Sequence, residues 1–549
     1  MQKILFYIFL LVIIIPNLCL SVLEPMGIIP ALANVLFPLG AIYLLMCITP
    51  KIGRTVWLMF PLIFIDAFQI ILLSLYGRSV IAVDMFLNVA TTNSAEVSEL
   101  LENLLPIIFV VAILYIPVLV LAVISIRKKE RLSRHFIFLN RKIAYSITAI
   151  GAALVMTSYA TTPDYSVKRD LYPVNAIYNV YLACDRTVRT SHYKETSKNY
   201  KYDAVSTHPD EMREAYILII GETSRADNWQ ILGYDRGTNP RLSKRQDVLA
   251  AGGAMSESNT THKSVPMLLS PVDATNFNDE IYRTKSLISA FKEAGYATAY
   301  ISNQRYNRSF IDFFSEESDT AIFIREQLGE NMKPNTRSFY DVDLLPIVKE
   351  ILSKNKNKQL IVLHTYGSHF NYKDRYDKQD ARFTPDDYTE AMKSERDRLI
   401  NAYDNTIVAT DRLISECINL LDSLDNTSAG LLYTSDHGED IFDNGSSRFL
   451  HASPLPTYFQ LHVPMIGWFS SEYQDSFSDN YKAAVNNFSK EISTSRSFCP
   501  TALQMAGIET EKSDTTASLM SESYKARDNF LYLSDHNVPV LLEDIILTK

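Results

Sequence analysis

The stretch Gly430–Asp440, GLLYTSDHGED, places a carboxylate and an imidazole directly after an apolar run. Leu431-Leu432-Tyr433 predicts a short buried strand, because strands of a parallel sheet are covered on both faces and are continuously apolar. Ligands of open α/β sheets bind just beyond the carboxyl ends of such strands. Asp436 and His437 offer one oxygen and one nitrogen donor that suit Zn²⁺. Taken alone, a polar turn after a strand is the simpler interpretation of this stretch.

Other apolar runs lead to polar side chains in the same way. They are Tyr216–Ile220 followed by Glu222, Ala297–Ile301 followed by Ser302-Asn303-Gln304, and Leu360–Leu363 followed by His364 and His369. Helical patterns separate these runs, which predicts an α/β domain with a mainly parallel central sheet. Several potential metal ligands at one sheet edge are hard to explain as turns, so the sequence predicts a metal site there.

The segment Asn259–Pro266, NTTHKSVP, is rich in hydroxyl groups and precedes an apolar run. The bare pattern favours the start of an N-capped helix. A threonine hydroxyl becomes a useful nucleophile only if its proton is removed, which zinc coordination can promote. His451 lies in a further polar segment, where a structural histidine is the commoner interpretation.

The first 160 residues contain five long apolar segments, at about 4–22, 28–48, 55–75, 104–126 and 142–159. Each is close to the ~20 residues that span a bilayer. The first run is long and is followed by no small-residue cleavage site, which favours a membrane span over a cleaved signal peptide. Asp66 lies inside the third segment and is expected to act as polar glue between helices, a functional role being the alternative.

Basic residues set the expected orientation. They lie between segments two and three and between segments four and five: Lys51, Arg54, Arg127, Lys128, Lys129, Arg131, Arg134, Arg141 and Lys142. Both loops are therefore predicted to be cytoplasmic, and five crossings place everything after about residue 160 outside. In a Gram-negative cell that compartment is the periplasm. The acidic stretch from Asp84 to Asn103 then lies outside, where a solvated connecting helix is the simplest expectation.

Three parts follow from this organisation: a five-helix transmembrane domain at 1–160, an interfacial helix and linker at 161–212, and an outside domain at 213–549. The chain has 549 residues, a net charge of −9 and a pI of about 5.7, which argues against a nucleic-acid partner. Three of its five cysteines lie in polar sequence, so one disulfide is possible and a disulfide framework is not.

At these residues the chain resembles the phosphoethanolamine transferases, inner-membrane enzymes of the alkaline phosphatase/sulfatase superfamily that include the lipid A modifying enzymes of polymyxin resistance. The likeness covers nearly the whole chain. Its pieces are five spans, G-E-T-x-R, T-x-x-S-V-P, H-x-x-G-S-H, S-D-H-G-E and L-H-x-x-P followed by V-P. The order and spacing of so many pieces make the resemblance specific.

The resemblance implies a role for each matching residue. Thr261 is similar to the nucleophile, and Glu222, Asp436 and His437 to the zinc ligands, with the Thr261 oxygen as the fourth. His369 and His451 resemble a pair that holds the phosphate or a second zinc. In N-V-x-x-T-N-x-A-E, Asn88 and Glu96 match positions near the ethanolamine.

The implied reaction moves phosphoethanolamine from phosphatidylethanolamine to Thr261 and then to lipid A or another lipopolysaccharide or glycan acceptor. One tightly bound Zn²⁺, a multi-pass inner-membrane location, a periplasmic catalytic domain and a monomer are expected. A phosphoglycerol transferase of the lipoteichoic-acid-synthase type is the alternative, and a sulfatase segment C/S-x-P-x-R is absent around Thr261. A membrane-anchored protein without catalytic activity is a further alternative. Such a protein would have lost the residues at the ligand positions, whereas this chain has all of them.

The chain departs from the family pattern at two places. Many relatives flank the nucleophile segment with a cysteine pair, whereas Ser258 to Ser270 contains no cysteine. The basic residue that the family carries near the strand ending at Ile301 has no clear match, and Arg305 or Arg308 could take its place. The missing cysteines make a disulfide bond around the nucleophile segment doubtful, but they do not affect the expected transfer reaction.

Overall fold

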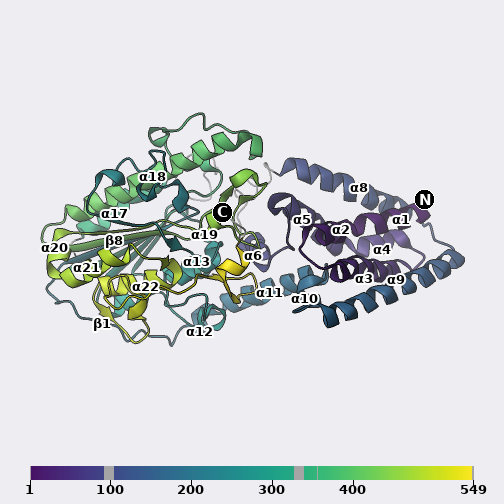
Figure 1. Cartoon of the computed structure of the whole chain (residues 1–549), viewed down its shortest axis with the longest axis horizontal. Coiled ribbons are helices and arrows are strands. Elements are labelled where there is room, and N and C mark those ends of the chain that lie inside the picture. Colours follow the sequence, from purple (N-terminus) through teal and green to yellow (C-terminus); the bar gives the residue numbers. More distant parts are fainter. Residues whose placement is uncertain (1, 92–103, 327–338, 355, 547–549) are drawn as a thin grey trace. The chain divides into compact units, whose positions relative to one another are not determined.

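The computed structural model describes residues 2–91, 104–326, 339–354 and 356–546 (Figure 1). Contacts within the chain divide it into two compact units. One comprises the described residues up to 90 and from 104 to 185, and the other begins at Arg186.

In its described part, the N-terminal unit consists of helices joined by short loops. Its elements are α1 (Gln2–Ile13), α2 (Ile15–Leu23), α3 (Ile28–Met46), α4 (Ile52–Leu58), α5 (Phe60–Tyr76), α6 (Val83–Thr91), α8 (Leu105–Arg127), α9 (Arg134–Thr161), α10 (Val167–Asp170) and the start of α11 (Val174–Ser191). Four spans of these helices are long and apolar enough to cross a membrane, or five if α4 and α5, bent by 58° relative to each other, count as one. The predicted helical membrane domain is therefore confirmed.

One helix extends beyond its apolar segment. The helix that contains the apolar segment 142–159 begins at Arg134, where the Ser133 side chain accepts a hydrogen bond from the Phe136 amide and caps the helix start. Arg134, Arg141 and Lys142 thus lie on the helix and not in a loop. They remain at the same end of the span, so the charge bias that predicts the orientation is unchanged.

Asp66 is buried inside the N-terminal unit. Its carboxylate accepts a hydrogen bond of 2.6 Å from the Tyr172 hydroxyl. The backbone of Tyr172 is held as well, since its amide donates to Asn34 and its carbonyl accepts from Asn17. Polar side chains on α2, α3 and α5 therefore fix the segment that follows the last span, as expected for polar glue between helices.

The C-terminal unit is built on a seven-stranded sheet with the order β3-β11-β8-β2-β7-β5-β6. Its strands are β2 (Glu214–Gly221), β3 (Val248–Ala251), β5 (Ala297–Ser302), β6 (Thr320–Phe323), β7 (Lys358–His364), β8 (Ser428–Ser435) and β11 (Met465–Phe469). β8, β2, β7, β5 and β6 run parallel, and β11 is antiparallel to β8 and to β3. The mainly parallel sheet is as predicted.

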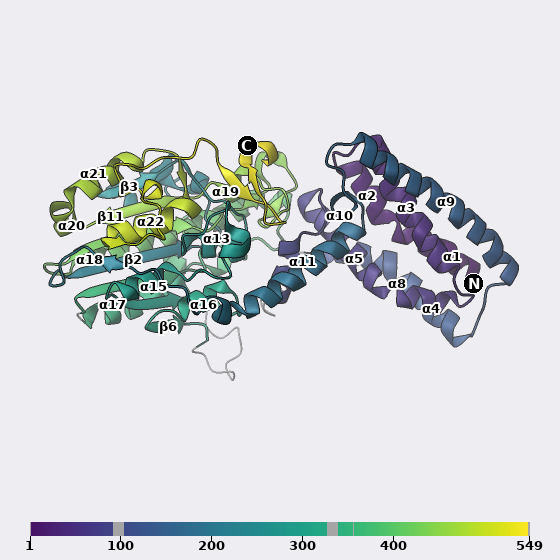
Figure 2. The same cartoon turned by 90° about the horizontal axis from the view of Figure 1, so that it is seen from below.

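Helices cover both faces of this sheet (Figure 1 and Figure 2). Alternate residues of β2 point to opposite sides, so Leu218 packs with α13 (Thr261–Leu268), α15 (Leu287–Glu293) and α22 (Thr494–Met505). Ile219 packs on the other side with α17 (Leu345–Ser353) and α18 (Arg396–Asp422). All eight residues of β2 are buried, which explains its continuous apolar sequence.

Candidate active site

The carboxyl ends of the central strands lie level with one another. Ile220 of β2 pairs with His364 of β7 on one side and with Thr434 of β8 on the other. The residues that follow these strands therefore leave the sheet at a common edge. This register brings Glu222 and Asp436 together, although they lie far apart in the sequence.

Glu222, Asp436 and His437 form a candidate metal-ligand cluster. One ligand atom of each lies within 4.8 Å of the others, and all three side chains are buried. In the described part of the chain, this is the one group of three or more histidine, cysteine or acidic side chains with that geometry. The structure thus brings together three residues that the sequence predicts as ligands.

The hydrogen bonds of the cluster show that it fits a cation. His437 Nδ1 lies 3.0 Å from the Gly438 carbonyl, to which it donates, so Nε2 carries a lone pair. Asp436 Oδ2 lies 3.3 Å from that Nε2 and is buried, with no hydrogen-bond donor among the residues that the structure describes. Acceptor atoms therefore face one another in a buried space, an arrangement that a bound metal ion stabilises. Burial raises the pKa of Asp436 to about 6.

Thr261 is the first residue of α13, and its hydroxyl points at the cluster. Its Oγ1 lies 3.1 Å from Glu222 Oε1 and 3.2 Å from His437 Nε2. The neighbouring hydroxyls point elsewhere: Ser264 donates to the Thr260 carbonyl, and the Thr260 hydroxyl contacts Ser258. Among these hydroxyl groups, Thr261 alone combines a contact to a predicted ligand with a place at the sheet edge.

His369 and His451 lie next to this cluster. The His451 ring is 4.2 Å from the His437 ring and 5.9 Å from the His369 ring, measured between centroids. Burial, together with the nearby Arg375 and His451, lowers the pKa of His369 to about 3. Burial also holds the pKa of His437 well below its usual range. Neutral imidazoles with free lone pairs are the form that binds metal ions.

Two site residues escaped the sequence analysis. Gln304 follows β5, and its Nε2 donates to Glu222 Oε2 at 3.3 Å and to the Thr365 carbonyl at 2.7 Å. Glu439 is buried and lies 3.2 Å from His451 Nδ1. Gln304 and Glu439 both lie in segments that contain predicted site features, but neither residue is predicted to be a metal ligand.

The structure does not connect the other predicted residues with the cluster. Arg305 and Arg308 make no described contact with it, so a neutral amide, Gln304, holds the position next to Glu222. Asn88 lies on α6 in the N-terminal unit, and Glu96 is outside the described residues. The cysteines, all within the described part, are free.

A glycine allows the backbones of the loops after β2 and β7 to pack closely against each other. Gly367 has a positive φ of 51°, and a Cβ atom there would lie 2.4 Å from the Glu222 carbonyl oxygen. The same carbonyl accepts a hydrogen bond of 2.9 Å from the Ser368 amide. The backbone of Glu222 is therefore held by a neighbouring loop that tolerates no side chain at this point.

Two family models match the chain. The sulfatase model matches residues 214–508, and the model of phosphoethanolamine transferase EptA/EptB matches residues 36–186. Together they cover the parallel sheet with its site and most of the N-terminal unit.

Relatives of known activity align with about half of their own length. Phosphoethanolamine transferase EptA of Salmonella typhimurium is 32% identical over 300 residues, which is 54% of this chain and 53% of that protein. Phosphatidylethanolamine transferase Mcr-1 of Escherichia coli is 30% identical over 308 residues, 54% of this chain and 56% of that protein. Kdo(2)-lipid A phosphoethanolamine 7''-transferase of Escherichia coli is 29% identical over 284 residues, 51% and 48% respectively.

Solved structures share the fold. The integral membrane lipooligosaccharide phosphoethanolamine transferase A of Neisseria meningitidis matches 92% of this chain and 97% of its own, with a TM-score of 0.73 and 23% identity. The soluble domain of that enzyme matches 60% of this chain and 99% of its own, with a TM-score of 0.53 and 26% identity. Because the sulfatase model alone covers more than half of the chain, the chain belongs to the sulfatase family, and its helical unit matches the model of phosphoethanolamine transferase EptA/EptB.

Proposed function

We propose that this protein transfers phosphoethanolamine from phosphatidylethanolamine to lipid A or to another lipopolysaccharide or glycan acceptor, with Thr261 as the covalent carrier. One observation carries the proposal: the Thr261 hydroxyl lies 3.1 Å from Glu222 and 3.2 Å from His437, beside a buried cluster of potential metal ligands. The activities named for the relatives support the same reaction class.

Glu222, Asp436 and His437 would hold the metal ion together with the Thr261 oxygen. An oxygen and nitrogen donor set without thiolate suits Zn²⁺, and tetrahedral coordination accounts for four ligands. When bound, the ion would favour the alkoxide form of Thr261 and neutralise charge on the phosphoryl oxygens. His369 and His451 lie beside this set and are proposed to hold the phosphate or a second ion.

In the first step, Thr261 Oγ1 forms a bond to the phosphorus of phosphatidylethanolamine, and the bond from phosphorus to the diacylglycerol oxygen breaks. Glu222 Oε1, 3.1 Å from the hydroxyl, is placed to accept the proton that Thr261 loses. The diacylglycerol oxygen takes up the proton that Glu222 accepted, and diacylglycerol leaves. In the second step, an acceptor hydroxyl or phosphate oxygen forms a bond to the phosphorus, the bond between phosphorus and Thr261 Oγ1 breaks, and Thr261 takes up a proton from the acceptor hydroxyl or from water.

Both expected substrates are lipid-anchored, which explains a catalytic domain joined to membrane helices. We assign residues 1–160 to the membrane, 161–212 to an interfacial helix and linker, and 213–549 to catalysis in the periplasm. Basic residues near Lys51 and between Arg127 and Lys142 support the orientation. Asn88 and Glu96 are proposed to contact the ethanolamine group.

The proposal is tested with the full-length protein in detergent and phosphatidylethanolamine as the sole substrate. We expect release of about one diacylglycerol per protein molecule and a phosphoethanolamine adduct on the peptide that contains Thr261. Addition of lipid A should then remove the adduct and produce modified lipid A. Absence of both diacylglycerol and adduct would refute the covalent route, and an adduct that no glycolipid removes would refute the acceptor class.

A further inference from the structure

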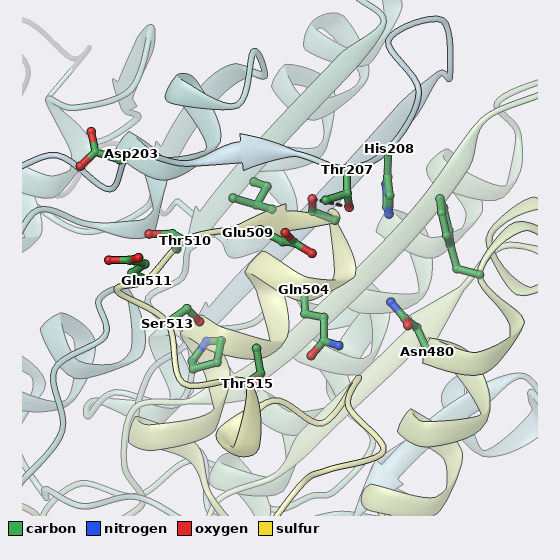
Figure 3. A pocket seen from close by; sticks show the side chains of 14 residues that line it. Asp203, Thr207, His208, Asn480, Gln504, Glu509, Thr510, Glu511, Ser513 and Thr515 are labelled. Carbon is green, nitrogen blue, oxygen red and sulfur yellow. Dashed lines mark hydrogen bonds between the residues drawn. The ribbon is translucent and has the colours of Figure 1, made fainter.

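Two cavities of the described chain differ in the charge of their lining. One, of about 750 Å³ in the C-terminal unit, has no lysine or arginine in its lining, and its carboxylates are Asp203, Glu509 and Glu511 (Figure 3). The other, of about 140 Å³ in the N-terminal unit and here called the basic pocket, is lined by four basic side chains: Lys51, Arg54, Lys129 and Arg131.

Positive charge dominates the lining of the basic pocket. Glu130 is its one carboxylate, so that four basic groups and one acidic group leave an excess of three positive charges. In the part of the chain that the structure describes, none of these five side chains forms an ion pair. The rest of the lining is uncharged and consists of Gly53, Ser125 and Ile126. This lining therefore favours an anion as its ligand.

The four basic residues come from two stretches of the chain. Two lie at the start of α4, and two follow the end of α8. The Leu132 amide donates a hydrogen bond of 3.0 Å to the Pro50 carbonyl. Their chain neighbours, Arg131 and Lys51, are therefore held close together. A charge bias that sets the orientation of membrane helices needs only the number of basic residues in each loop. Their gathering around one cavity is a further property, and it points to binding.

The backbone that carries Lys129 has a defined and unusual conformation. At the end of α8, the Glu130 amide donates a hydrogen bond of 3.2 Å to the Ser125 carbonyl. The Lys129 amide donates one of 3.1 Å to the Ile126 carbonyl. Together these bonds form a Schellman motif, in which the residue after the helix cap has a positive φ and is usually glycine. Here it is Lys129, with a φ of 51°. Because this conformation is unfavourable for a residue with a Cβ atom, the lysine indicates a role for its charge.

A glycine brings two helices together at the inner wall of the basic pocket. A Cβ atom at Gly53 of α4 would lie 2.5 Å from the Ala122 carbonyl oxygen of α8 and 3.0 Å from Ser125 Oγ. Only glycine allows the two helices to approach this closely. Ser125 is buried, and its hydroxyl oxygen accepts a hydrogen bond of 2.7 Å from the side-chain amide of Gln2. The wall is thus formed before a ligand binds, as in most sites for small molecules.

An apolar surface continues from the basic pocket along α4. Trp57 and Leu58 lie three and four residues after Arg54 and therefore on the same side of the helix. Their side chains are 40% and 82% exposed, and Trp57 stacks on Phe60 with 5.7 Å between ring centroids. Exposed aromatic side chains beside basic groups are typical of the boundary between lipid headgroups and acyl chains. A ligand that has both a phosphate group and acyl chains matches this combination.

We propose that the basic pocket binds the phosphate group of an anionic phospholipid, whose acyl chains lie along the apolar surface of α4. Arg54 and Lys129 pair with the phosphate oxygens, since charged N–H donors form strong hydrogen bonds to phosphate. Basic pockets between membrane helices hold phospholipid headgroups in this way. The site lies within the N-terminal unit, and it depends neither on the proposed transfer reaction nor on the orientation of the helices.

Native mass spectrometry of the delipidated full-length protein in detergent tests this assignment. Dioleoylphosphatidylglycerol should bind at least tenfold more tightly than dioleoylphosphatidylcholine, which has the same acyl chains but no net charge. The difference should shrink as the salt concentration rises, because it arises from attraction between charges. Equal binding of the two lipids would overturn the proposal.

A soluble phosphate ester distinguishes a lipid site from a site for free phosphate compounds. Glycerol 3-phosphate carries the phosphate group without acyl chains and should bind at least tenfold more weakly than phosphatidylglycerol. Equal binding of glycerol 3-phosphate would overturn the proposal in favour of a soluble ligand.

Matched variants locate the site. The double variant Arg54→Gln/Lys129→Gln should weaken phosphatidylglycerol binding at least tenfold. The control Arg134→Gln/Lys142→Gln removes the same charge from exposed positions that do not line the pocket, and should leave binding within twofold. An equal loss in the control pair would show diffuse attraction to basic residues, which contradicts a specific pocket.

The variant Lys129→Gly separates the charge of this residue from its backbone conformation. Glycine adopts a positive φ without strain, so the loop should fold and the melting temperature without lipid should not fall. Phosphatidylglycerol binding should nevertheless weaken several-fold. Binding within twofold of the wild type would overturn the role assigned to Lys129.

Discussion

The side-chain amide of Gln304 donates a hydrogen bond of 3.3 Å to the carboxylate of Glu222. Gln304 follows β5, Glu222 follows β2, and β7 lies between these strands in the sheet. The same amide donates to the carbonyl of Thr365, which directly follows β7, and is thereby fixed in place. Gln304 therefore orients a ligand of the proposed metal ion from two strands away.

Replacement of Gln304 by leucine should weaken metal binding. Groups that hydrogen-bond to metal ligands typically contribute about 10–100-fold to metal affinity. We expect a loss of this size for Gln304→Leu, measured by competition with a chelator, together with an unchanged melting temperature. Gln474→Leu, which removes a similar amide bonded to the Phe469 carbonyl, is the control. Unchanged zinc affinity in Gln304→Leu would contradict the positioning role.

Removing the charge of a proposed metal ligand should weaken zinc binding more than removing the hydrogen bond from Gln304 to Glu222 does. Asp436→Asn keeps the size of the side chain but replaces a carboxylate oxygen by an amide, and should leave the purified full-length protein with little zinc. Elemental analysis measures this directly. Asp247→Asn, in which the carboxylate pairs with Arg245 far from any predicted ligand, should retain close to one zinc per chain. Equal zinc content in both variants would show that Asp436 is not a ligand.

Substitutions of Thr261 separate the nucleophile from its neighbours. Thr261→Ala removes one hydroxyl and should abolish both transfer and the covalent adduct, while Thr261→Ser keeps the oxygen and should retain some transfer. Peptide mass spectrometry of the wild type should find the adduct on Thr261. Thr260→Ala and Ser264→Ala are matched controls, because these hydroxyls bond elsewhere. Normal transfer by Thr261→Ala would refute the assignment.

The buried carboxyl of Asp411 should make stability depend on pH. Burial raises its pKa from 3.8 to about 6, so the folded protein binds this proton more tightly than the unfolded chain does. The resulting stabilisation is fully present below about pH 3.8 and is lost as the pH rises through 6. Asp411→Asn lacks this titration and should gain roughly 2–3 kcal/mol relative to the wild type between pH 4 and pH 7.

Thermal unfolding of the full-length protein at pH 4.5, 5.5 and 7.0 measures this change. The carboxylate of Asp411 accepts hydrogen bonds of 3.0 Å from the amides of Arg241 and Leu242. In Asp411→Asn the side-chain amide oxygen can still accept from these groups, so the fold should persist. Asp397→Asn changes an exposed carboxyl on the same helix and should show no such trend. A difference between Asp411→Asn and the wild type that stays constant with pH would contradict the prediction.

The proposed orientation predicts the activity of reporter fusions. Alkaline phosphatase folds into an active enzyme only outside the cytoplasm, so fusion after residue 200 should be active and fusion after residue 133 inactive. The basic residues at both predicted cytoplasmic loops motivate this expectation. A β-galactosidase fusion at the same positions serves as the control and should give the opposite pattern. Reversed activities would place the sheet domain in the cytoplasm.

The sequence predicts the elements of this fold better than the contacts between them. Buried parallel strands are continuously apolar, so β2, β5, β7 and β8 could be located within two or three residues, and the proposed ligands Glu222 and Asp436 follow from their ends. The order of the strands in the sheet cannot be predicted from any single stretch of the sequence. Gln304 was missed for this reason, since its role depends on β5 lying one strand beyond β7.

The start of α9 shows a second limit. Hydrophobicity indicates where a helix crosses a membrane, but the helix itself continues through Arg141 and Lys142 to its cap at Ser133. Charged side chains at the end of a span are compatible with helix, so composition alone cannot locate the boundary. The metal-ligand cluster, in contrast, was predictable because its members are chemically distinctive residue types at strand ends.

The contact between Gly367 and the Glu222 carbonyl has a consequence for mutational tolerance. In a saturation library selected for function, a position normally tolerates substitution when its side chain makes no contact with substrate. Gly367 has no side chain, yet any replacement would place a Cβ atom 2.4 Å from the Glu222 carbonyl oxygen and displace the backbone that presents a ligand. Such a library should therefore show this glycine to be as intolerant as the proposed nucleophile Thr261, at a position where only backbone contributes to the site.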